Sequence, residues 1–375
     1  MRVLHAYSGN LYGGVETMLV TLARQRDLCA EMKPEFALCF EGRLSEELVA
    51  AGALVHQLGH VRASQPGSLL RARRKLRELL RIESFDVVIC HAPWSLAMFG
   101  SAVRRARVPV VFWQHGPVSG RHWSERWARR TPPDLVLCNS QFTAQSVPRI
   151  FPQARSEVIY CPVAFPQVNY SRDDCLATRA ELNTPEDAVV IIQVSRMEAW
   201  KGHALQLEAL GLLSDIPHWV CWQVGGAQRP VEELYVEEMK SAASRHGIEE
   251  RVHFLGERQD VERLLAAADV FSQPNTGPEP FGITLIEALF AGLPIVTTAL
   301  GGALEIIDES CGFLVAPGEV DDLSRSLGHL IEDSELRTLL ALGGPTRARE
   351  LCEPREQLRR LNELLASVFR RKVAA

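Results

Sequence analysis

Short, nearly uninterrupted hydrophobic runs alternate along the chain with longer stretches in which hydrophobic residues recur every three or four positions. The short runs are rich in Val, Ile and Phe, which is typical of strands buried on both faces of a parallel sheet. Six such runs are predicted as strands in the first half: 3–8, 36–40, 53–58, 86–91, 110–115 and 135–140. Six more follow in the second half: 189–195, 220–226, 252–256, 269–274, 294–299 and 312–317. The pattern predicts an α/β protein with two Rossmann-like, doubly wound domains.

A proline-punctuated stretch, CPVAFPQVNY (161–170), separates the two sets of strands and is the candidate hinge. We therefore expect domains at 1–165 and 166–353, which suits a chain of 375 residues. Ligands of doubly wound sheets bind beyond the carboxyl ends of the strands. The two domains are expected to face each other across a cleft at those ends.

The composition is that of an ordinary globular protein, with 23% charged and 46% hydrophobic residues. No hydrophobic stretch approaches the roughly 20 residues of a membrane span, and the first residues lack the pattern of a secretory signal. The nine cysteines include no Cys-x-x-Cys pair. Reduced core thiols are therefore favoured over disulfides or a zinc site, which fits a cytoplasmic protein.

Charge is divided unevenly between the halves. Residues 1–165 hold 21 Lys and Arg against 13 Asp and Glu, whereas the remainder holds 20 against 33. Such an asymmetry indicates that the halves meet different partners, and that the partner of the first half is anionic.

The segment EPFGITLIEALFAG (279–292) combines a loop, a hydrophobic helix and two acids. Pro280 and Gly282 mark the loop, and the helix is expected to begin at Ile283. Glu279 then stands at a helix entrance, where free N–H groups favour an anion. Glu287 lies inside the helix. From these residues alone, two interpretations are open. Either both acids are functional, or Glu279 only interacts with the helix dipole and Glu287 only faces solvent.

Other polar residues follow predicted strands. Gly13-Gly14 allows a sharp turn before a helix near Val15. His115 is the last residue of the predicted strand 110–115. A lone histidine at a strand end is more often structural than catalytic, and the structural interpretation is kept for His91.

After the strand 189–195, Arg196 and Lys201 precede a new helix, a combination that suits a phosphate clamp or a solvated surface. A second glycine pair, Gly301-Gly302, follows the strand 294–299, and Glu305 lies in the next helix.

In this order and at these distances, the motifs resemble the retaining glycosyltransferases of family four, also called group 1 glycosyltransferases. The resemblance rests on GGVE near the start, a His-Gly after a mid-domain strand, SRMEAWKG, and EPFGITLIEALFAGLPIVTTALGGALE. Ser195 departs from the family, which commonly has glycine before the arginine. The resemblance covers nearly the whole chain and implies the GT-B fold, with an acceptor-side domain 1–165, a nucleotide-sugar domain 166–353 and a final helix, 354–372, that packs back on the first domain.

The resemblance also implies roles for single residues. Glu279 would lie against the donor sugar, and Glu287 would bind the ribose hydroxyls. Arg196 and Lys201 would hold the diphosphate, and His115 would lie near the transferred sugar. The remaining donor-site candidates share a place at a glycine turn or a helix start: Gly14, Phe281, Gly282 and Ile283, followed by Gly13, Gly302 and Glu305.

Departure of a sugar from a nucleoside diphosphate places negative charge on the leaving oxygen. Many transferases stabilise this charge with a divalent ion held by Asp-x-Asp, a motif that this sequence lacks. Arg196, Lys201 and the helix N-termini are expected to act instead, so we expect neither a metal site nor a cofactor. The resemblance further implies retention by front-face attack, with UDP favoured over GDP as the carrier and a saccharide or lipid-linked saccharide as acceptor.

Two alternatives share this architecture. One is a nucleotide-sugar epimerase or a phosphorylase, and no segment provides the acid/base set or the cofactor lysine that these need. The other is a non-catalytic nucleotide-sugar-binding protein. The motif residues are intact, which favours the transferase. A donor-hydrolysis assay would separate the transferase from the non-catalytic protein.

The basic stretch 69–81 forms either the solvated face of a helix or a contact with an anionic membrane. Its predicted hydrophobic stripe consists of five residues: Leu69, Leu76, Leu79, Leu80 and Ile82. The cations and aromatics of 121–130 are candidates for the acceptor side. The protein is thus expected in the cytoplasm, with peripheral contact at the inner membrane face as an option, and no nucleic acid partner.

Overall fold

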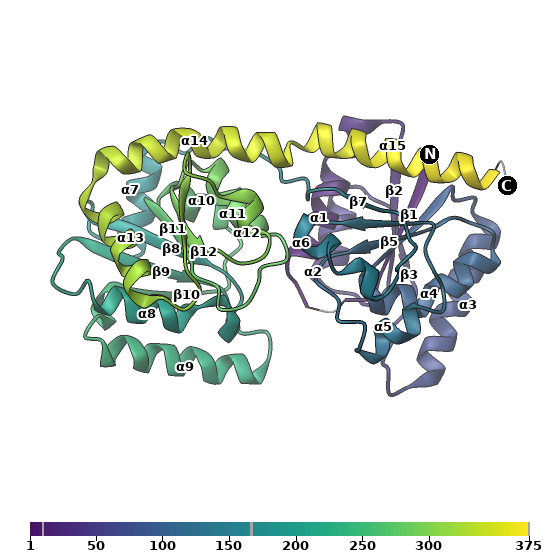
Figure 1. Cartoon of the computed structure of the whole chain (residues 1–375), viewed down its shortest axis with the longest axis horizontal. Helices are drawn as coiled ribbons and strands as arrows, with labels where there is room; N and C mark the ends of the chain where they lie inside the picture. Colours follow the sequence, from purple (N-terminus) through teal and green to yellow (C-terminus); the bar gives the residue numbers. More distant parts are fainter. Residues whose placement is uncertain (10, 166–167, 374–375) are drawn as a thin grey trace. The chain divides into compact units, whose positions relative to one another are not determined.

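The computed structural model describes residues 1–9, 11–165 and 168–373, and it divides into two compact units (Figure 1). Unit 1 comprises Met1–Ala164 and Cys352–Ala375, and unit 2 comprises Phe165–Leu351. Asn10, in the first glycine loop, and residues 166–167, within the predicted hinge 161–170, lie outside the described residues.

Unit 1 is built on a seven-stranded parallel sheet with the order β3-β2-β1-β4-β5-β6-β7. Its strands are β1 (Arg2–Tyr7), β2 (Lys33–Leu38), β3 (Val55–Gln57), β4 (Val87–His91), β5 (Val110–Gln114), β6 (Leu135–Cys138) and β7 (Ser156–Val158). The chain reverses its direction of travel across the sheet between β1 and β4. Such a switch point creates a crevice for ligands at the carboxyl edge of a doubly wound sheet.

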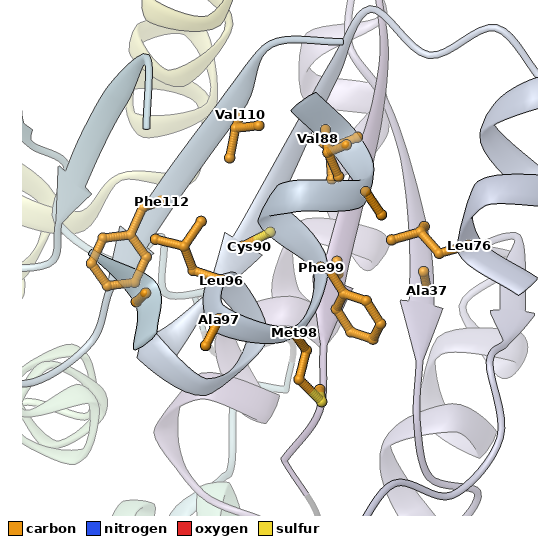
Figure 2. Packing of buried hydrophobic residues seen from close by; sticks show 14 of the residues in the cluster. Ala37, Leu76, Val88, Cys90, Leu96, Ala97, Met98, Phe99, Val110 and Phe112 are labelled. Atoms are coloured by element: carbon orange, nitrogen blue, oxygen red, sulfur yellow. The ribbon is translucent and has the colours of Figure 1, made fainter. Parts of the chain in front are cut away.

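Helices connect these strands. They are α1 (Gly14–Arg24), α2 (Arg43–Ala50), α3 (Pro66–Ile82), α4 (Ala92–Arg105), α5 (Trp123–Ala128) and α6 (Gln141–Ala144), with short 3-10 turns η1 (Arg26–Cys29) and η2 (Val147–Arg149). The last helix, α15 (Pro354–Val373), contacts η1 and belongs to unit 1. Figure 2 shows the core between the sheet and α3 and α4, where Val88, Cys90 and Phe112 meet Leu96 and Phe99.

Unit 2 contains a six-stranded parallel sheet with the order β10-β9-β8-β11-β12-β13. Its strands are β8 (Val189–Val194), β9 (Trp219–Val224), β10 (Val252–Gly256), β11 (Val270–Gln273), β12 (Ile295–Thr298) and β13 (Gly312–Val315). Its helices are α7 (Arg172–Glu181), α8 (His203–Gly211), α9 (Pro230–Arg245), α10 (Val261–Ala266), α11 (Ile283–Phe290), α12 (Ala303–Ile306), α13 (Val320–Glu332) and α14 (Ser334–Cys352), with η3 (Ala199–Lys201) and η4 (Glu249–Arg251). The two parallel sheets confirm the predicted α/β class with two Rossmann-like units.

The basic stretch 69–81 lies within α3. Leu76 and Leu80 are buried, and Leu69 and Leu79 pack partly against the same core. The predicted stripe is wrong at Ile82, the last residue of α3, which is 65% exposed. Within the described residues, no helix is long and hydrophobic enough to span a membrane.

Candidate active site

Glu279 lies in the loop between β11 and α11, at the carboxyl edge of the sheet in unit 2. Its Oε2 atom lies 2.6 Å from Nζ of Lys201, and the two side chains are only 11% and 13% exposed. The same oxygen accepts hydrogen bonds from the side-chain amides of Asn275 (3.2 Å) and Gln273 (3.3 Å). Three donors from two strand ends therefore fix one carboxylate oxygen, which is more than a helix-dipole partner requires.

A tight turn brings Lys201 to this carboxylate. Gly202 has φ of 78°, and a Cβ atom there would come within 1.8 Å of the carbonyl oxygen of Pro274. Glycine thus lets the start of α8 lie directly against the end of β11. The carbonyl oxygen of Lys201 also accepts a 2.9 Å hydrogen bond from Gln193, and its Nζ lies 4.1 Å from the ring centroid of Trp200.

The loop of Glu279 is held by its own glycines. Gly282 caps α11 with φ of 112°, in the left-handed region that favours glycine, and α11 begins at Ile283. The side chain of Phe281 is buried in the core, so a ligand can meet only its backbone. Gly302 donates its N–H to the carbonyl oxygen of Glu279 (2.7 Å), and Gly301 forms a parallel bridge with Glu279. In this structure, the second glycine pair therefore supports the Glu279 loop.

Arg196, which follows β8 after Ser195, is also paired. Its guanidinium lies 2.9 Å from Glu198. The other oxygen of Glu198 lies 3.0 Å from Arg229, and the indole of Trp200 donates a 3.0 Å hydrogen bond to Glu198. Two arginines from neighbouring strand ends therefore share one carboxylate. The sequence did not single out Glu198, Trp200 or Arg229, although the first two stand between Arg196 and Lys201.

Glu287 lies in the second turn of α11 and is partly buried. Burial raises the pKa of its carboxyl to about 7, and the negative charge of Glu262 acts in the same direction. Glu287 is therefore less exposed than a fully solvent-facing residue would be. Glu305, in α12, is also partly buried, and its carbonyl oxygen accepts a hydrogen bond of 2.8 Å from Arg347.

A cavity of about 350 Å³ lies at the ends of β8, β9 and β10 in unit 2. Its lining combines small, hydrophobic and charged residues: Met197, Gly225, Gly226, Ala227, Glu233, Val236, Glu237, Lys240, Phe254 and Gly256. Met197 is the neighbour of Arg196 in sequence, so the cavity adjoins the strand end that carries the arginine.

In unit 1, the first glycine pair is engaged within the protein. Gly13 is extended, with φ of −168°, and its N–H donates to Glu16 (2.9 Å), which also accepts from the hydroxyl of Tyr7. Gly14 is the first residue of α1, one position before the predicted start at Val15. The backbone N–H of Gly13 is therefore already satisfied by Glu16.

His115 directly follows β5 and is partly exposed. Its Nε2 lies 2.9 Å from Nδ1 of His91, and Nε2 of His91 lies 2.9 Å from Nδ1 of His5. Burial lowers the pKa of His5 and of His115 to about 3 each, and it holds the pKa of His91 well below its ordinary value. His91 was interpreted as structural from the sequence, and His5 was not singled out. The structure joins both residues to His115.

The stretch 121–130 contains the short helix α5. Trp123 is 50% exposed and lies 5.2 Å from Trp94, centroid to centroid. Glu125 is buried and accepts from Ser119 and from the backbone N–H of His122. Among residues 1–9, 11–165 and 168–373, no cluster of three His, Cys, Asp or Glu side chains has the arrangement of a metal site.

Two family models match the chain. The model described as "Glycosyltransferase Family 4" matches residues 12–165, and the model described as "Glycosyl transferases group 1" matches residues 176–343. Together they cover both units.

Several known proteins are similar in sequence or structure. The lipopolysaccharide core biosynthesis glycosyltransferase LpsE of Rhizobium meliloti is 30% identical over 44% of this chain, which spans 46% of LpsE. The GDP-mannose-dependent monoacylated alpha-(1-6)-phosphatidylinositol monomannoside mannosyltransferase of Corynebacterium glutamicum is 26% identical over 88% of each chain. The crystal structure of Anabaena HepE in complex with UDP-glucose superposes with a TM-score of 0.85 at 26% identity, covering 98% of this chain and 100% of HepE.

Proposed function

We propose that this chain, which belongs to the group 1 glycosyltransferases of family 4 and has the GT-B fold, transfers a sugar from a nucleoside-diphosphate sugar to an acceptor hydroxyl with retention and without a metal ion. The observation that carries the proposal is the paired arrangement of Lys201 with Glu279 and of Arg196 with Glu198 at the carboxyl edge of unit 2. Two cations and two carboxylates in one place suit a ligand that carries both phosphates and hydroxyls.

In this proposal the diphosphate takes the place of carboxylates beside the two cations. Arg196 and Lys201 each have a carboxylate partner at 2.6–2.9 Å, so both cations are neutralised when no ligand is bound. A phosphate oxygen of the donor then replaces the carboxylate. Arg196 supplies a planar fork and Lys201 a compact charge. Once released from Lys201, Glu279 still has its amide donors and can accept hydrogen bonds from the donor sugar.

The nucleoside is assigned to the same unit. Glu287 accepts hydrogen bonds from the two ribose hydroxyls, and the 350 Å³ cavity beside Met197 holds the base. The N–H groups of Ile283 and Thr284 stand at the positive dipole end of α11, whereas those of Leu285 and Ile286 already donate to the carbonyl oxygen of Gly282. The neighbouring backbone of Phe281 and Gly282 supplies further contacts. Gly14, Gly13, Gly302 and Glu305 remain candidates with a supporting role.

The transfer step needs no enzymic nucleophile. The bond between the anomeric carbon and the diphosphate oxygen breaks, and the acceptor hydroxyl forms its bond on the same face of the sugar. The proton of that hydroxyl passes to the departing phosphate oxygen. Arg196 and Lys201 stabilise the negative charge on the leaving group, and Glu279 stabilises the positive charge that builds on the sugar.

The charge of the two units supports a division of substrates. Unit 1, with α15 included, holds 27 Lys and Arg against 16 Asp and Glu, whereas unit 2 holds 14 against 30. We assign the acceptor to unit 1, where His115 and the segment 121–130 lie. An envelope saccharide or a lipid-linked saccharide suits this basic unit, since LpsE and the mannosyltransferase of C. glutamicum are named for lipopolysaccharide and phosphatidylinositol substrates. Peripheral contact with the cytoplasmic face of an anionic membrane through α3 belongs to the same proposal.

UDP is favoured as the carrier, because HepE binds UDP-glucose. The C. glutamicum relative is GDP-mannose-dependent, so a test must include both carriers. The protein should be incubated in EDTA with a panel of UDP- and GDP-sugars, and release of nucleoside diphosphate measured with and without an acceptor extract. Release from one sugar nucleotide, stimulated by the acceptor, supports the proposal. Binding of a donor with no release under any condition would favour the non-catalytic alternative.

A further inference from the structure

Three histidines in unit 1 form a continuous row across three neighbouring strands. His5 lies in β1, His91 is the last residue of β4, and His115 directly follows β5. The register pairs His5 with Ile89, and His91 with Trp113. Each step of the row therefore crosses one strand and advances two residues, which keeps all three side chains on one face of the sheet.

The three rings are joined end to end. Both N···N distances are 2.9 Å, and the ring centroids lie 5.2 Å and 5.1 Å apart with interplanar angles of 17° and 14°. These values describe nearly coplanar imidazoles linked through their nitrogens. His5 and His91 are completely buried, whereas His115 is partly exposed, so the row leads from the interior to the carboxyl edge of the sheet.

The geometry allows only two arrangements of protons in the neutral row. Each inner contact needs one N–H and one bare nitrogen, so the direction of donation is the same at both contacts. If His5 donates to His91 and His91 to His115, then His115 carries its proton on Nδ1. If the direction is reversed, the outer nitrogen of His115 is bare.

The buried end of the row selects between them. Nε2 of His5 is buried and has no hydrogen-bond partner among the described residues. Donation toward His115 leaves a bare lone pair at this position, whereas the reverse direction leaves an unpaired N–H. Orphaned buried N–H groups are the rarer of the two in native proteins. The backbone of His115 is held separately, since Asn139 donates to its carbonyl oxygen (3.2 Å).

We propose that His5 and His91 are positioning residues that fix His115 as a neutral imidazole with its proton on Nδ1, so that it donates a hydrogen bond to a hydroxyl oxygen of a saccharide bound at the carboxyl edge of unit 1. No described carboxylate hydrogen-bonds to any of the three rings, so nothing in the row favours an imidazolium. A neutral N–H donor also suits an uncharged hydroxyl, which can accept its hydrogen bond. This inference rests on the proposed function; it makes His115 a hydrogen-bond donor and excludes it as the base.

The first test reads the tautomer directly and needs no substrate. Long-range ¹H–¹⁵N spectra of ¹⁵N-histidine-labelled protein, assigned with His115→Phe, should show His115 protonated at Nδ1 and bare at Nε2 near pH 7.5. A proton on Nε2 of His115 would overturn the proposal. Because the protein is ligand-free, this result is independent of whether sugar transfer is the reaction.

The second test is a pair of variants on the same face of β4. His91→Phe keeps a ring in place but removes both hydrogen bonds, so His115 should shift toward the Nε2–H tautomer, and kcat/KM should fall roughly three- to tenfold, the value of one neutral hydrogen bond. Ile89→Val, two residues earlier, should lower the Tm while tautomer and kcat/KM stay unchanged.

A double-mutant cycle separates positioning from general damage. In the His115→Phe background, His91→Phe should have no further effect on kcat/KM, because its influence passes through His115. Full additivity of the two losses would contradict the proposal. Should His91→Phe fail to fold, the wild-type tautomer measurement still decides it.

Discussion

The two units share one architecture but carry opposite kinds of polar group at the carboxyl edges of their sheets. Unit 2 places ions there, with Lys201 against Glu279 and Arg196 against Glu198. Unit 1 places neutral imidazoles there, with the pKa of His115 lowered to about 3 by burial. The difference teaches that a doubly wound sheet does not define its ligand. Paired ions suit an exchange with a diphosphate, whereas neutral donors suit uncharged hydroxyls.

The largest expected effect comes from removing the cations of unit 2. Arg196→Ala and Lys201→Ala should each lower kcat by about 10²–10³, because the charge that they meet is greatest in the transition state. Donor KM should change less. Steady-state kinetics of both variants check this, with Arg325→Ala, an exposed arginine of α13, as the matched control. A change in KM alone would mean that both cations bind only the ground state.

Glu287 provides the next test of unit 2. If its carboxylate binds the ribose hydroxyls, Glu287→Ala should weaken donor binding by about 1.5–3 kcal/mol, the scale of hydrogen bonds to a charged group. Calorimetric titration measures this, and Glu208→Ala, on the exposed side of α8, is the control. Unchanged donor affinity would return Glu287 to a structural role.

The raised pKa of Glu287 gives the same prediction a pH dependence. The carboxylate is the form that accepts from two hydroxyls, so donor affinity should rise as the pH increases through about 7. Binding should release a proton, detected as a dependence of the binding heat on the buffer. Glu287→Gln should abolish both effects.

The histidines of unit 1 should make it sensitive to acid. The pKa of His5 is lowered from 6.5 to about 3, so the stability that the neutral ring contributes is present above pH 6.5 and is lost as the pH falls toward 3. Between pH 7.5 and 5.5, His5→Phe should remove about 1 kcal/mol of the acid-induced loss in unfolding free energy. Urea unfolding at the two pH values checks this, and His329→Gln, an exposed histidine of α13, should leave the loss unchanged.

The smallest expected effect concerns the basic charge of unit 1. Exposed charges are screened beyond about 10 Å at 0.1 M salt. Raising the salt should therefore increase acceptor KM a few-fold, or release the protein from anionic vesicles, with little change in donor KM. Equal salt sensitivity for both substrates would contradict the assignment of an anionic acceptor to unit 1.

Most of the fold follows from the sequence because buried parallel strands leave near-continuous hydrophobic runs. The site is a different case. Glu279 was singled out at a helix entrance and Lys201 at a helix start after a strand, and the structure brings the two side chains together. The link from Arg196 through Glu198 to Arg229 was not predictable, because Glu198 and Arg229 meet only when β8 and β9 lie side by side. The contact of His5 with His91 could not be predicted from a single histidine within a hydrophobic strand. It depends on the register of β1 with β4.

The central claim is that the paired cations of unit 2 hold a nucleoside diphosphate without a metal ion. Calorimetric titration of UDP and GDP into the protein in excess EDTA tests it most directly. One of the two nucleotides should bind in EDTA with an affinity that magnesium or manganese leaves unchanged, and Arg196→Ala should weaken that affinity at least tenfold. Binding that appears only after a divalent ion is added, or that is indifferent to Arg196→Ala, would contradict the claim.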